Sequence, residues 1–307
     1  MNLPSLRMLF SVAILWTGLL SGLSASARPA GDWSSESKAK AKRALIIGLG
    51  EQQDKAWSKI NGDRDVPMVR RMLEASGFTD IRTLVNRQAT KAGIVKAFCR
   101  LAAECQAGDV VYVHFSGHGQ QMTDLDGDEA DGYDEAWVPY DACMAYCSAD
   151  RGEKHISDDE LGNMLASIRR RVGKSGKILV VVDACHSGGI TRGMEEAAET
   201  QEAERGARDA FCIPGKAAPK GTVKQKEENW LTISACKSYE SNFELKDKKV
   251  GKLSYALCQM LGKDLKLTNA EIEARLRAFM KRNPGRMQQT PVLTGMKKAM
   301  SVSGMFM

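Results

Sequence analysis

The chain has 307 residues, enough for one large domain or two small ones. Hydrophobic residues make up 43% and charged residues 27%, which is ordinary for a soluble globular protein. The formal net charge of +6 is mild, and no dense Lys/Arg block with interleaved aromatic residues occurs. Composition and charge therefore argue against a nucleic-acid partner.

The N-terminus has the three-part pattern of a secretory signal peptide. Arg7 precedes an apolar run, and Ala25-Ser26-Ala27 forms an A-x-A cleavage pattern. The run is shorter than the roughly 20 apolar residues that a membrane span needs. We therefore expect residues 1–27 to be removed on export to the periplasm or the exterior, with no stable membrane insertion afterwards. An uncleaved membrane anchor is the alternative.

Eight cysteines are spread along the chain. In an exported protein they can form disulfides, and two pairs, Cys99 with Cys105 and Cys143 with Cys147, are close enough in sequence to be candidates. A zinc site is not expected, because the chain has no paired C-x-x-C and only four His.

The elements expected along the chain alternate between strands and helices. After a flexible leader over 28–42, apolar runs predict strands at 43–50, 81–85, 110–115, 135–138, 177–183 and 230–235. Amphipathic helices are predicted at 63–76, 90–104, 251–262 and 269–282, and a capping box at 157–160 opens another that reaches about residue 171. This alternation indicates an α/β fold with a mostly parallel sheet covered by helices on both faces.

One long connection interrupts this pattern. Residues 190–226 carry almost no apolar periodicity, and a loop of this length inside a compact domain is usually functional or disordered. We expect one domain over 43–300, divided into a large portion at 43–189, a loop at 190–228 and a small portion at 229–300.

Two of the predicted strands end in polar residues that carry chemistry. His118 follows the strand at 110–115, and Cys185 follows the strand at 177–183. Ligands bind beyond the carboxyl ends of parallel strands, so the two side chains are expected to meet at one sheet edge. A thiolate attacks an acyl carbon once an imidazole has taken the thiol proton, and the same imidazole can later protonate the leaving amine.

The motifs around these two residues resemble those of a known peptidase family. Ser-Gly-His-Gly at 116–119 and Asp-Ala-Cys-His-Ser-Gly at 183–188 resemble the caspase/metacaspase superfamily of cysteine peptidases, within the caspase–hemoglobinase fold. The acid-rich stretch 124–135, followed by Val-Pro-Tyr-Asp, is similar to metacaspases and their bacterial relatives in particular. The resemblance covers residues 43 to 295, including Ser-Ala-Cys-Lys at 234–237.

The resemblance implies a central sheet of six strands and a role for several residues. Cys185 would be the nucleophile and His118 the general acid–base, and the backbone N–H groups of Gly119 and Cys185 would form the oxyanion hole. His186 adjoins the nucleophile and is not expected to be the base. The chemistry requires no cofactor, and members of the family are usually monomers.

The resemblance also implies cleavage after Arg or Lys. Asp65, Ser116 and Asp183 match an acidic specificity pocket, and a buried carboxylate pair can accept the fork of a guanidinium. Asp65 also suits a simpler role as a carboxylate at a helix start. Substrates would be proteins or peptides with Arg or Lys before the cleaved bond.

Calcium activation is a further expectation from the resemblance. Asp134, Asp158 and Asp159 match three positions of the metacaspase calcium site, whereas the fourth falls at Arg192, a cation. The stretch 124–135 itself does not fit an EF-hand loop, because Glu129 stands where the glycine should be. Asp158 and Asp159 are equally suited to the first turn of a helix, so both interpretations stay open.

The loop at 190–226 lies where relatives are cut between the two portions of the domain. It contains basic residues that such an enzyme could cleave after: Arg192, Arg205, Arg208, Lys216, Lys220, Lys224 and Lys226. We therefore expect self-processing in this loop. The alternatives are a caspase-fold peptidase of different specificity and a catalytically silent caspase-like scaffold that binds partner proteins.

Overall fold

The computed structural model describes residues 40–185, 203–207, 209–216, 229–261, 267–285, 287–295 and 301–306. The expected signal peptide lies outside the described residues, and export stays a prediction. No helix among the described residues is long and apolar enough to cross a membrane. The residues from Lys40 onward form one compact unit.

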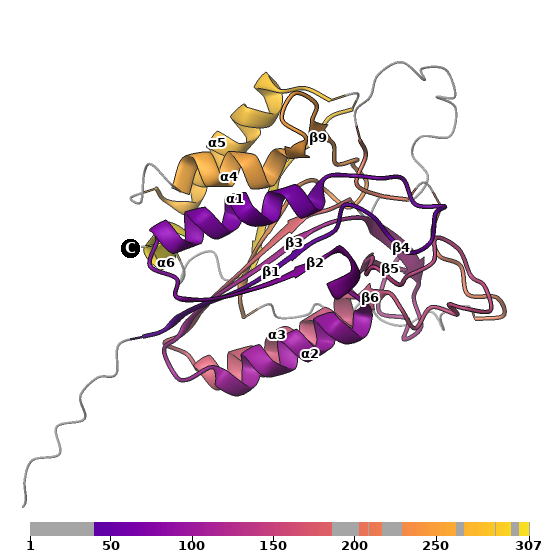
Figure 1. Ribbon diagram of the computed structural model, residues 1–307, viewed down its shortest axis with the longest axis horizontal. Helices are drawn as coiled ribbons and strands as arrows, with labels where there is room; N and C mark the ends of the chain where they lie inside the picture. Colours follow the sequence, from indigo (N-terminus) through magenta and orange to yellow (C-terminus); the bar gives the residue numbers. More distant parts are fainter. Residues whose placement is uncertain are drawn as a thin grey trace, which may run out of the picture. The chain divides into compact units, whose positions relative to one another are not determined.

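A six-stranded sheet forms the centre of this unit, in the order β11-β8-β7-β3-β1-β2 (Figure 1). Five strands run parallel, and β11 pairs antiparallel with β8. The predicted mostly parallel sheet is therefore confirmed. Its strands are β1 (Lys42–Gly48), β2 (Asp80–Val85), β3 (Val110–Ser116), β7 (Lys177–Asp183), β8 (Leu231–Ser234) and β11 (Val292–Gly295).

The central strands β1, β3 and β7 end level with one another. Helices cover both faces of a parallel sheet, so such strands are continuous apolar runs, and all three are buried along most of their length. Their register pairs Gly48 with Ser116 and Ser116 with Asp183. The residues that follow these strands therefore emerge side by side at one edge of the sheet.

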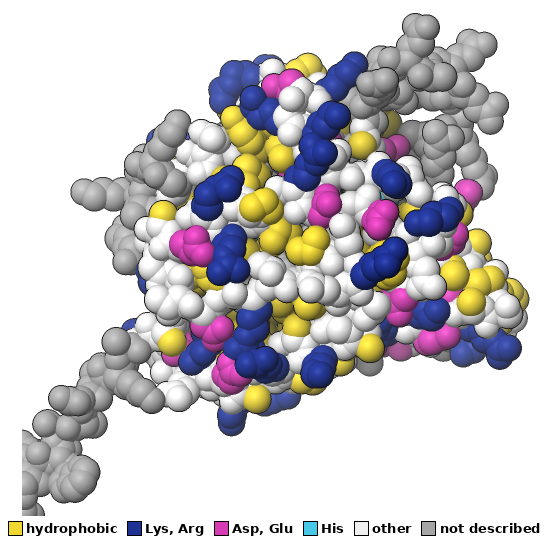
Figure 2. Space-filling view, in the orientation of Figure 1, with side chains coloured by type: hydrophobic (Ala, Val, Ile, Leu, Met, Phe, Trp, Pro, Cys, Tyr) yellow, Lys and Arg dark blue, Asp and Glu magenta, His cyan; other side chains and the backbone are white. Residues whose placement is uncertain are grey.

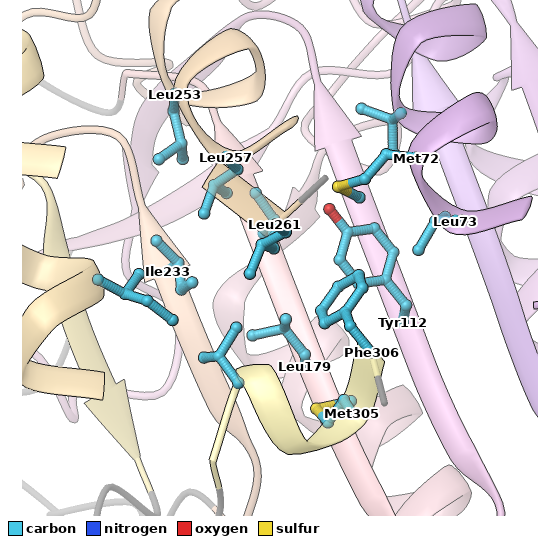
Figure 3. Close-up of a cluster of buried hydrophobic side chains, with 14 of the residues drawn as sticks. Met72, Leu73, Tyr112, Leu179, Ile233, Leu253, Leu257, Leu261, Met305 and Phe306 are labelled. Atoms are coloured by element: carbon cyan, nitrogen blue, oxygen red, sulfur yellow. The ribbon is translucent and has the colours of Figure 1, made fainter. Parts of the chain in front are cut away.

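One face of the sheet is covered by α1 (Gly62–Ala75), α4 (Lys252–Leu261), α5 (Asn269–Arg282) and α6 (Ser303–Phe306). In Figure 3, Leu257 and Leu261 of α4 point toward the sheet, where Tyr112 and Leu179 lie among the buried side chains. The apolar face predicted for α1 is also buried in this core, through Val66, Val69, Met72 and Leu73.

The opposite face carries α2 (Lys91–Glu104) and α3 (Asp158–Val172), with a short 3₁₀ helix at Asn86–Gln88. The hydroxyl of Ser157 accepts the backbone N–H of Glu160, which satisfies one of the free donors at the start of α3. The predicted N-terminus of this helix is therefore confirmed. On the face shown in Figure 2, Lys and Arg side chains are dispersed among Asp and Glu side chains.

Two small sheets lie outside the central one. β4 (Gly119–Thr123), β5 (Tyr133–Trp137) and β6 (Ile156–Ser157) form the first, and β9 (Glu244–Leu245) and β10 (Val250–Gly251) form the second. The strand expected at 135–138 thus belongs to a separate sheet. β4 was not predicted, because its sequence, Gly-Gln-Gln-Met-Thr, has no apolar alternation.

Gly62 is tightly enclosed where α1 begins beside the ends of β1 and β3. A Cβ at this position would lie 2.4 Å from the carbonyl oxygen of Ser116 and 2.5 Å from that of Leu49. We predict that Gly62→Ala lowers the free energy of unfolding by about 2 kcal/mol or more, because two backbone segments must move. Denaturant unfolding measures this change.

Gly162, inside α3, provides the matched control. A Cβ there would meet no atom within 4 Å, and alanine is the better helix former, so Gly162→Ala should stabilise the protein by about 0.5–1 kcal/mol. If both substitutions changed the free energy of unfolding in the same direction, the steric explanation for Gly62 would be contradicted.

Candidate active site

The paired ends of β3 and β7 bring the two predicted chemical residues to one place. Ser116 and Asp183 are register partners, and the N–H of Gly117 lies 3.4 Å from the carbonyl oxygen of Asp183. His118 and Cys185 each follow two residues later, and both are fully buried.

His118 is held as a neutral base. Its Nε2 lies 2.9 Å from the carbonyl oxygen of Ser58, which can only accept, so Nε2 carries the ring proton. The other nitrogen, Nδ1, has no hydrogen-bond partner among the described residues. Burial lowers the pKa of His118 to about 4, against the opposing effect of the Ser58 carbonyl, and the charge of Arg205 lowers it further. At neutral pH the imidazole is therefore uncharged, and its Nδ1 carries a free lone pair.

Aromatic packing fixes the imidazole in this orientation. The ring of Trp57 lies 4.9 Å from that of His118, centroid to centroid, and the indole N–H donates to the carbonyl of Ala142 at 3.1 Å. Cys185 is positioned by backbone contacts, since its thiol donates to the carbonyl of Glu240 at 3.0 Å. The thiol of Cys236 lies 3.2 Å from the same oxygen.

The carbonyl group of Arg205 lies against the backbone N–H groups of Cys185 and Gly119. Its oxygen accepts the N–H of Cys185 at 2.8 Å and the N–H of Gly119 at 3.3 Å. These are the two donors that the sequence predicted for an oxyanion hole. The next residue, Gly206, is pressed against the thiol side chain, because a Cβ there would lie 3.0 Å from Cβ and 3.2 Å from Sγ of Cys185.

The guanidinium of Arg205 fills the predicted acidic pocket. Nη1 lies 2.9 Å from Oδ2 of Asp65 and 3.4 Å from Oδ1 of Asp183, and it donates to the Ser116 hydroxyl at 2.6 Å. Nε and Nη2 both donate to Oε1 of Glu244, at 3.0 and 2.9 Å. The side chain is completely buried, so each charge in the pocket is satisfied by another group of the protein.

The pocket carboxylates are themselves anchored by hydrogen bonds. Asp183 accepts the amide of Asn242 at 2.7 Å and both the backbone N–H and the hydroxyl of Ser254, at 2.8 and 2.7 Å. Asp65 accepts the Ser116 hydroxyl and the N–H of Gly251. These contacts orient the carboxylates before any ligand arrives.

The two aspartates differ in their affinity for protons. For Asp65, burial is the largest effect and raises the pKa to about 6, although the charge of Arg205 acts to lower it. Burial also acts to raise the pKa of Asp183, but Arg205 and the hydrogen bonds from Ser254 and Asn242 outweigh it, and the pKa is lowered. Asp183 is thus the fixed anion of the pocket and Asp65 the one that titrates more easily.

Sequence patterns did not indicate several residues of this site. Glu244 supplies two guanidinium contacts and is held by the backbone N–H and side-chain amide of Asn61. Glu244 lies in no motif, and Trp57, Ser58 and Asn242 likewise stand in segments with no periodicity. Only tertiary contacts reveal them.

The three aspartates expected to bind calcium are near enough for the charges of Asp158 and Asp159 to act on Asp134, which belongs to the acid-rich stretch. Asp134 on β5 is 6% exposed, and its Oδ1 has no hydrogen-bond partner among the described residues. Burial, followed by the charges of Asp158, Asp124, Asp159 and Asp126, raises its pKa to about 8. Ligand atoms of three more acidic groups lie within 4.8 Å of one another: Asp124, Asp126 and Asp128.

Other residues singled out in the sequence are placed as follows. His186 and Arg192 lie outside the described residues, and within the expected processing loop the described basic residues are Arg205 and Lys216. The sulfurs of Cys143 and Cys147 are 3.4 Å apart. Cys99 is exposed and Cys105 is buried.

Solved structures share this fold. Caspase-1 from Spodoptera frugiperda matches with a TM-score of 0.55 at 12% identity, over 84% of this chain and 87% of that one. A protein from Geobacter sulfurreducens matches with a TM-score of 0.58 at 24% identity, over 83% of this chain and 92% of that one. The architecture is therefore the caspase fold.

A family model described as Caspase domain matches residues 41–300. The chain belongs to this family, peptidase family C14. Among curated proteins it is similar to metacaspase-1B of Aspergillus fumigatus, with 40% identity over 99 residues, which is 32% of this chain and 22% of the relative. Metacaspase-1A of the same organism is 40% identical over 101 residues, 33% of this chain and 22% of that one. The match thus spans about a fifth of these metacaspases.

Proposed function

We propose that the chain is a cysteine endopeptidase that cleaves after Arg or Lys. One observation carries this proposal: the Arg205 carbonyl accepts hydrogen bonds from Gly119 and Cys185 while its guanidinium fills the acidic pocket. Recognition of the side chain and polarisation of the carbonyl thus occur on the same residue, next to the thiol. A protein that only binds partners would need to recognise the side chain but would not need to polarise the carbonyl.

The proposed reaction uses the two reactive side chains that follow the paired ends of β3 and β7. Nδ1 of His118 takes the proton of the Cys185 thiol, and the thiolate forms a bond to the carbonyl carbon of the residue in the pocket. The oxygen becomes an anion and is stabilised by the two backbone N–H groups. The imidazolium then protonates the leaving amine as the C–N bond breaks. Water, activated by the neutral imidazole, hydrolyses the thioester and restores the thiol.

Specificity for basic residues follows from charge and geometry. A cation in the pocket faces the carboxylates of Asp65, Asp183 and Glu244, whereas an acidic side chain would meet like charge without solvent. Nε and both terminal nitrogens of the guanidinium contact carboxylates, whereas Lys would keep the charge but lose the fork. We infer a preference for Arg over Lys.

Short fluorogenic substrates test this specificity. The protein should hydrolyse substrates ending in Arg and, more slowly, Lys, but not Asp. Glu244→Gln should lower kcat/KM for the Arg substrate by about tenfold or more, because two charge-assisted hydrogen bonds weaken. Glu273→Gln, in a surface pair with Arg277, is the control and should leave kcat/KM unchanged.

Turnover has to be measured with and without calcium and a reductant. Absence of turnover of all three substrates under every condition would contradict the peptidase proposal and favour a catalytically silent scaffold.

The bond between Arg205 and Gly206 is the self-processing site that these contacts support. Among the described basic residues of the loop, Arg205 is buried in the pocket and Lys216 is exposed. Gly206 suits the position after the cleaved bond, since a side chain there would press on Cys185.

We therefore predict a new N-terminus at Gly206. Mass spectrometry of the purified wild-type protein should detect it, whereas Cys185→Ala should remain uncut. Arg205→Gln should remove this cleavage, because an amide cannot replace the guanidinium charge, and Lys216→Gln should retain it. Cleavage at Gly206 in the Cys185→Ala protein would exclude self-processing.

We also propose that calcium binds at the acidic cluster of Asp134, Asp158 and Asp159. Carboxylate oxygens are the ligands that calcium prefers. The buried, unpartnered oxygen of Asp134 fits such a role, as does the crowding of negative charge around it. A bound divalent cation would offset this repulsion between β5 and the start of α3.

Thermal unfolding tests this proposal without relying on activity. In chelator-treated protein, calcium at saturating concentration should raise the Tm by about 5 °C or more, because it binds only the folded state. Asp134→Asn should abolish the shift. Asp131→Asn, an exposed neighbour, should retain it. Equal calcium-induced Tm shifts in the two variants would show that calcium does not bind at Asp134.

A further inference from the structure

Two of the described residues after Arg205 form backbone bridges with β4. Gly206 and Phe211 form parallel bridges with Gly119 and Met122. The N–H of Ala207 donates to the carbonyl of Gly119 at 3.2 Å. Main-chain hydrogen bonds of this kind hold any extended peptide, whatever its side chains. These contacts thus run from the oxyanion site onto the sheet formed by β4, β5 and β6.

Phe211 is the anchor of this segment. Its N–H donates to the carbonyl of Gln121 at 2.7 Å, and its carbonyl accepts the N–H of Thr123 at 3.0 Å. The ring is completely buried and packs in a cluster with Met122, Ala136 and Ile213. The imidazole of His155 lies 4.6 Å from it, centroid to centroid. β4, β5 and the residue just before β6 therefore build an apolar pocket for one large side chain.

A bulge fixes the distance between this pocket and the cleaved bond. From Gly206 to Phe211 the segment advances five residues (211 − 206), while β4 advances three between their partners (122 − 119). Gln120 contacts this segment at Asp209, because its side-chain amide donates to the carbonyl of Asp209 at 2.8 Å. The same side chain accepts His155 at 2.9 Å, so it is fixed from both sides.

We propose that this pocket is a distal specificity site for substrates, an inference that rests on the peptidase function proposed above. It selects a large apolar side chain at the sixth residue after the cleaved bond. The preferred substrates are extended polypeptide segments with a basic residue, a small residue directly after it, and Phe or a residue of similar size at that distance. The backbone hydrogen bonds contribute affinity for any extended segment, and the pocket selects a large apolar side chain.

Peptides of constant length test the pocket in solution. The parent peptide spans residues 203–214, with Arg208 replaced by Gln and Cys212 by Ser, so that only one basic residue remains. The position of Phe211 carries Phe, Tyr, Leu or Ala. A further peptide exchanges the two residues, with Ser at position 211 and Phe at position 212, which keeps the composition but changes the register.

The peptides compete in one mixture with the wild-type full chain, and mass spectrometry follows the bond after Arg205. Ratios of kcat/KM from competition do not depend on how much of the enzyme's own segment still occupies the site. The kcat/KM of the Phe peptide should be about tenfold or more above that of the Ala peptide, mainly through a lower KM. The reason is that binding removes an aromatic ring from water in the Phe peptide but not in the Ala peptide. The shifted peptide should behave like the Ala peptide.

Equal ratios for the Phe, Ala and shifted peptides would overturn the distal site. A short substrate ending in Arg, which has no residues beyond the cleaved bond, separates this result from failure of the peptidase function. If that substrate is hydrolysed, only the distal site is wrong. If neither the short substrate nor any peptide is hydrolysed, the peptidase proposal is wrong, and the distal-site proposal that rests on it is wrong as well.

The full chain supplies a second readout. Phe211→Ala should slow self-cleavage after Arg205 about tenfold, and Phe211→Tyr or Phe211→Leu should restore it. Cys212→Ala, at the exposed neighbouring position, should cleave at the wild-type rate. Hydrolysis of the short Arg substrate by the Phe211→Ala protein shows that the variant is folded. Unchanged self-cleavage in that folded variant would contradict the proposal.

Discussion

The buried ion cluster around Arg205 is the interaction on which the rest of the site depends. Its guanidinium contacts carboxylates from α1, from the end of β7 and from β9, so one side chain joins three separate parts of the chain. Removing a single partner from a buried ion cluster leaves an uncompensated charge, which is strongly destabilising. The cluster therefore sets the relative positions of the large and small portions, and with them the position of the carbonyl beside Cys185.

Much of this arrangement could be predicted from the sequence, because local signals agreed with the fold. The strand at 177–183 has the expected bounds, since a continuous apolar run closed by a polar residue admits few alternatives. His118 and Cys185 were recognisable because each follows such a strand. The pocket residues Asp65, Ser116 and Asp183 were proposed from resemblance, and the structure gathers them around one guanidinium.

Other features depend on contacts between distant segments and leave no local pattern. Glu244 meets Arg205 only because the chain returns to the sheet edge after β8, and nothing in its neighbourhood distinguishes it from a surface glutamate. The position of Arg205, rather than another of the seven basic residues of the loop, in the acidic pocket likewise depends on tertiary contacts. β4 is polar, so its strand character comes from pairing with β5 and with the segment after Gly206.

The different proton affinities of the pocket aspartates have a consequence for the reaction cycle. Burial is the main cause that raises the pKa of Asp65 to about 6, and the positive charge of Arg205 acts to lower it. When a basic side chain leaves the pocket, that effect disappears, and the pKa of Asp65 rises further toward the neutral range. If the pocket takes basic side chains as proposed, we expect departure of the product to be accompanied by uptake of a proton by Asp65, and entry of the next basic side chain to expel it. Acidic surroundings should then favour the empty pocket.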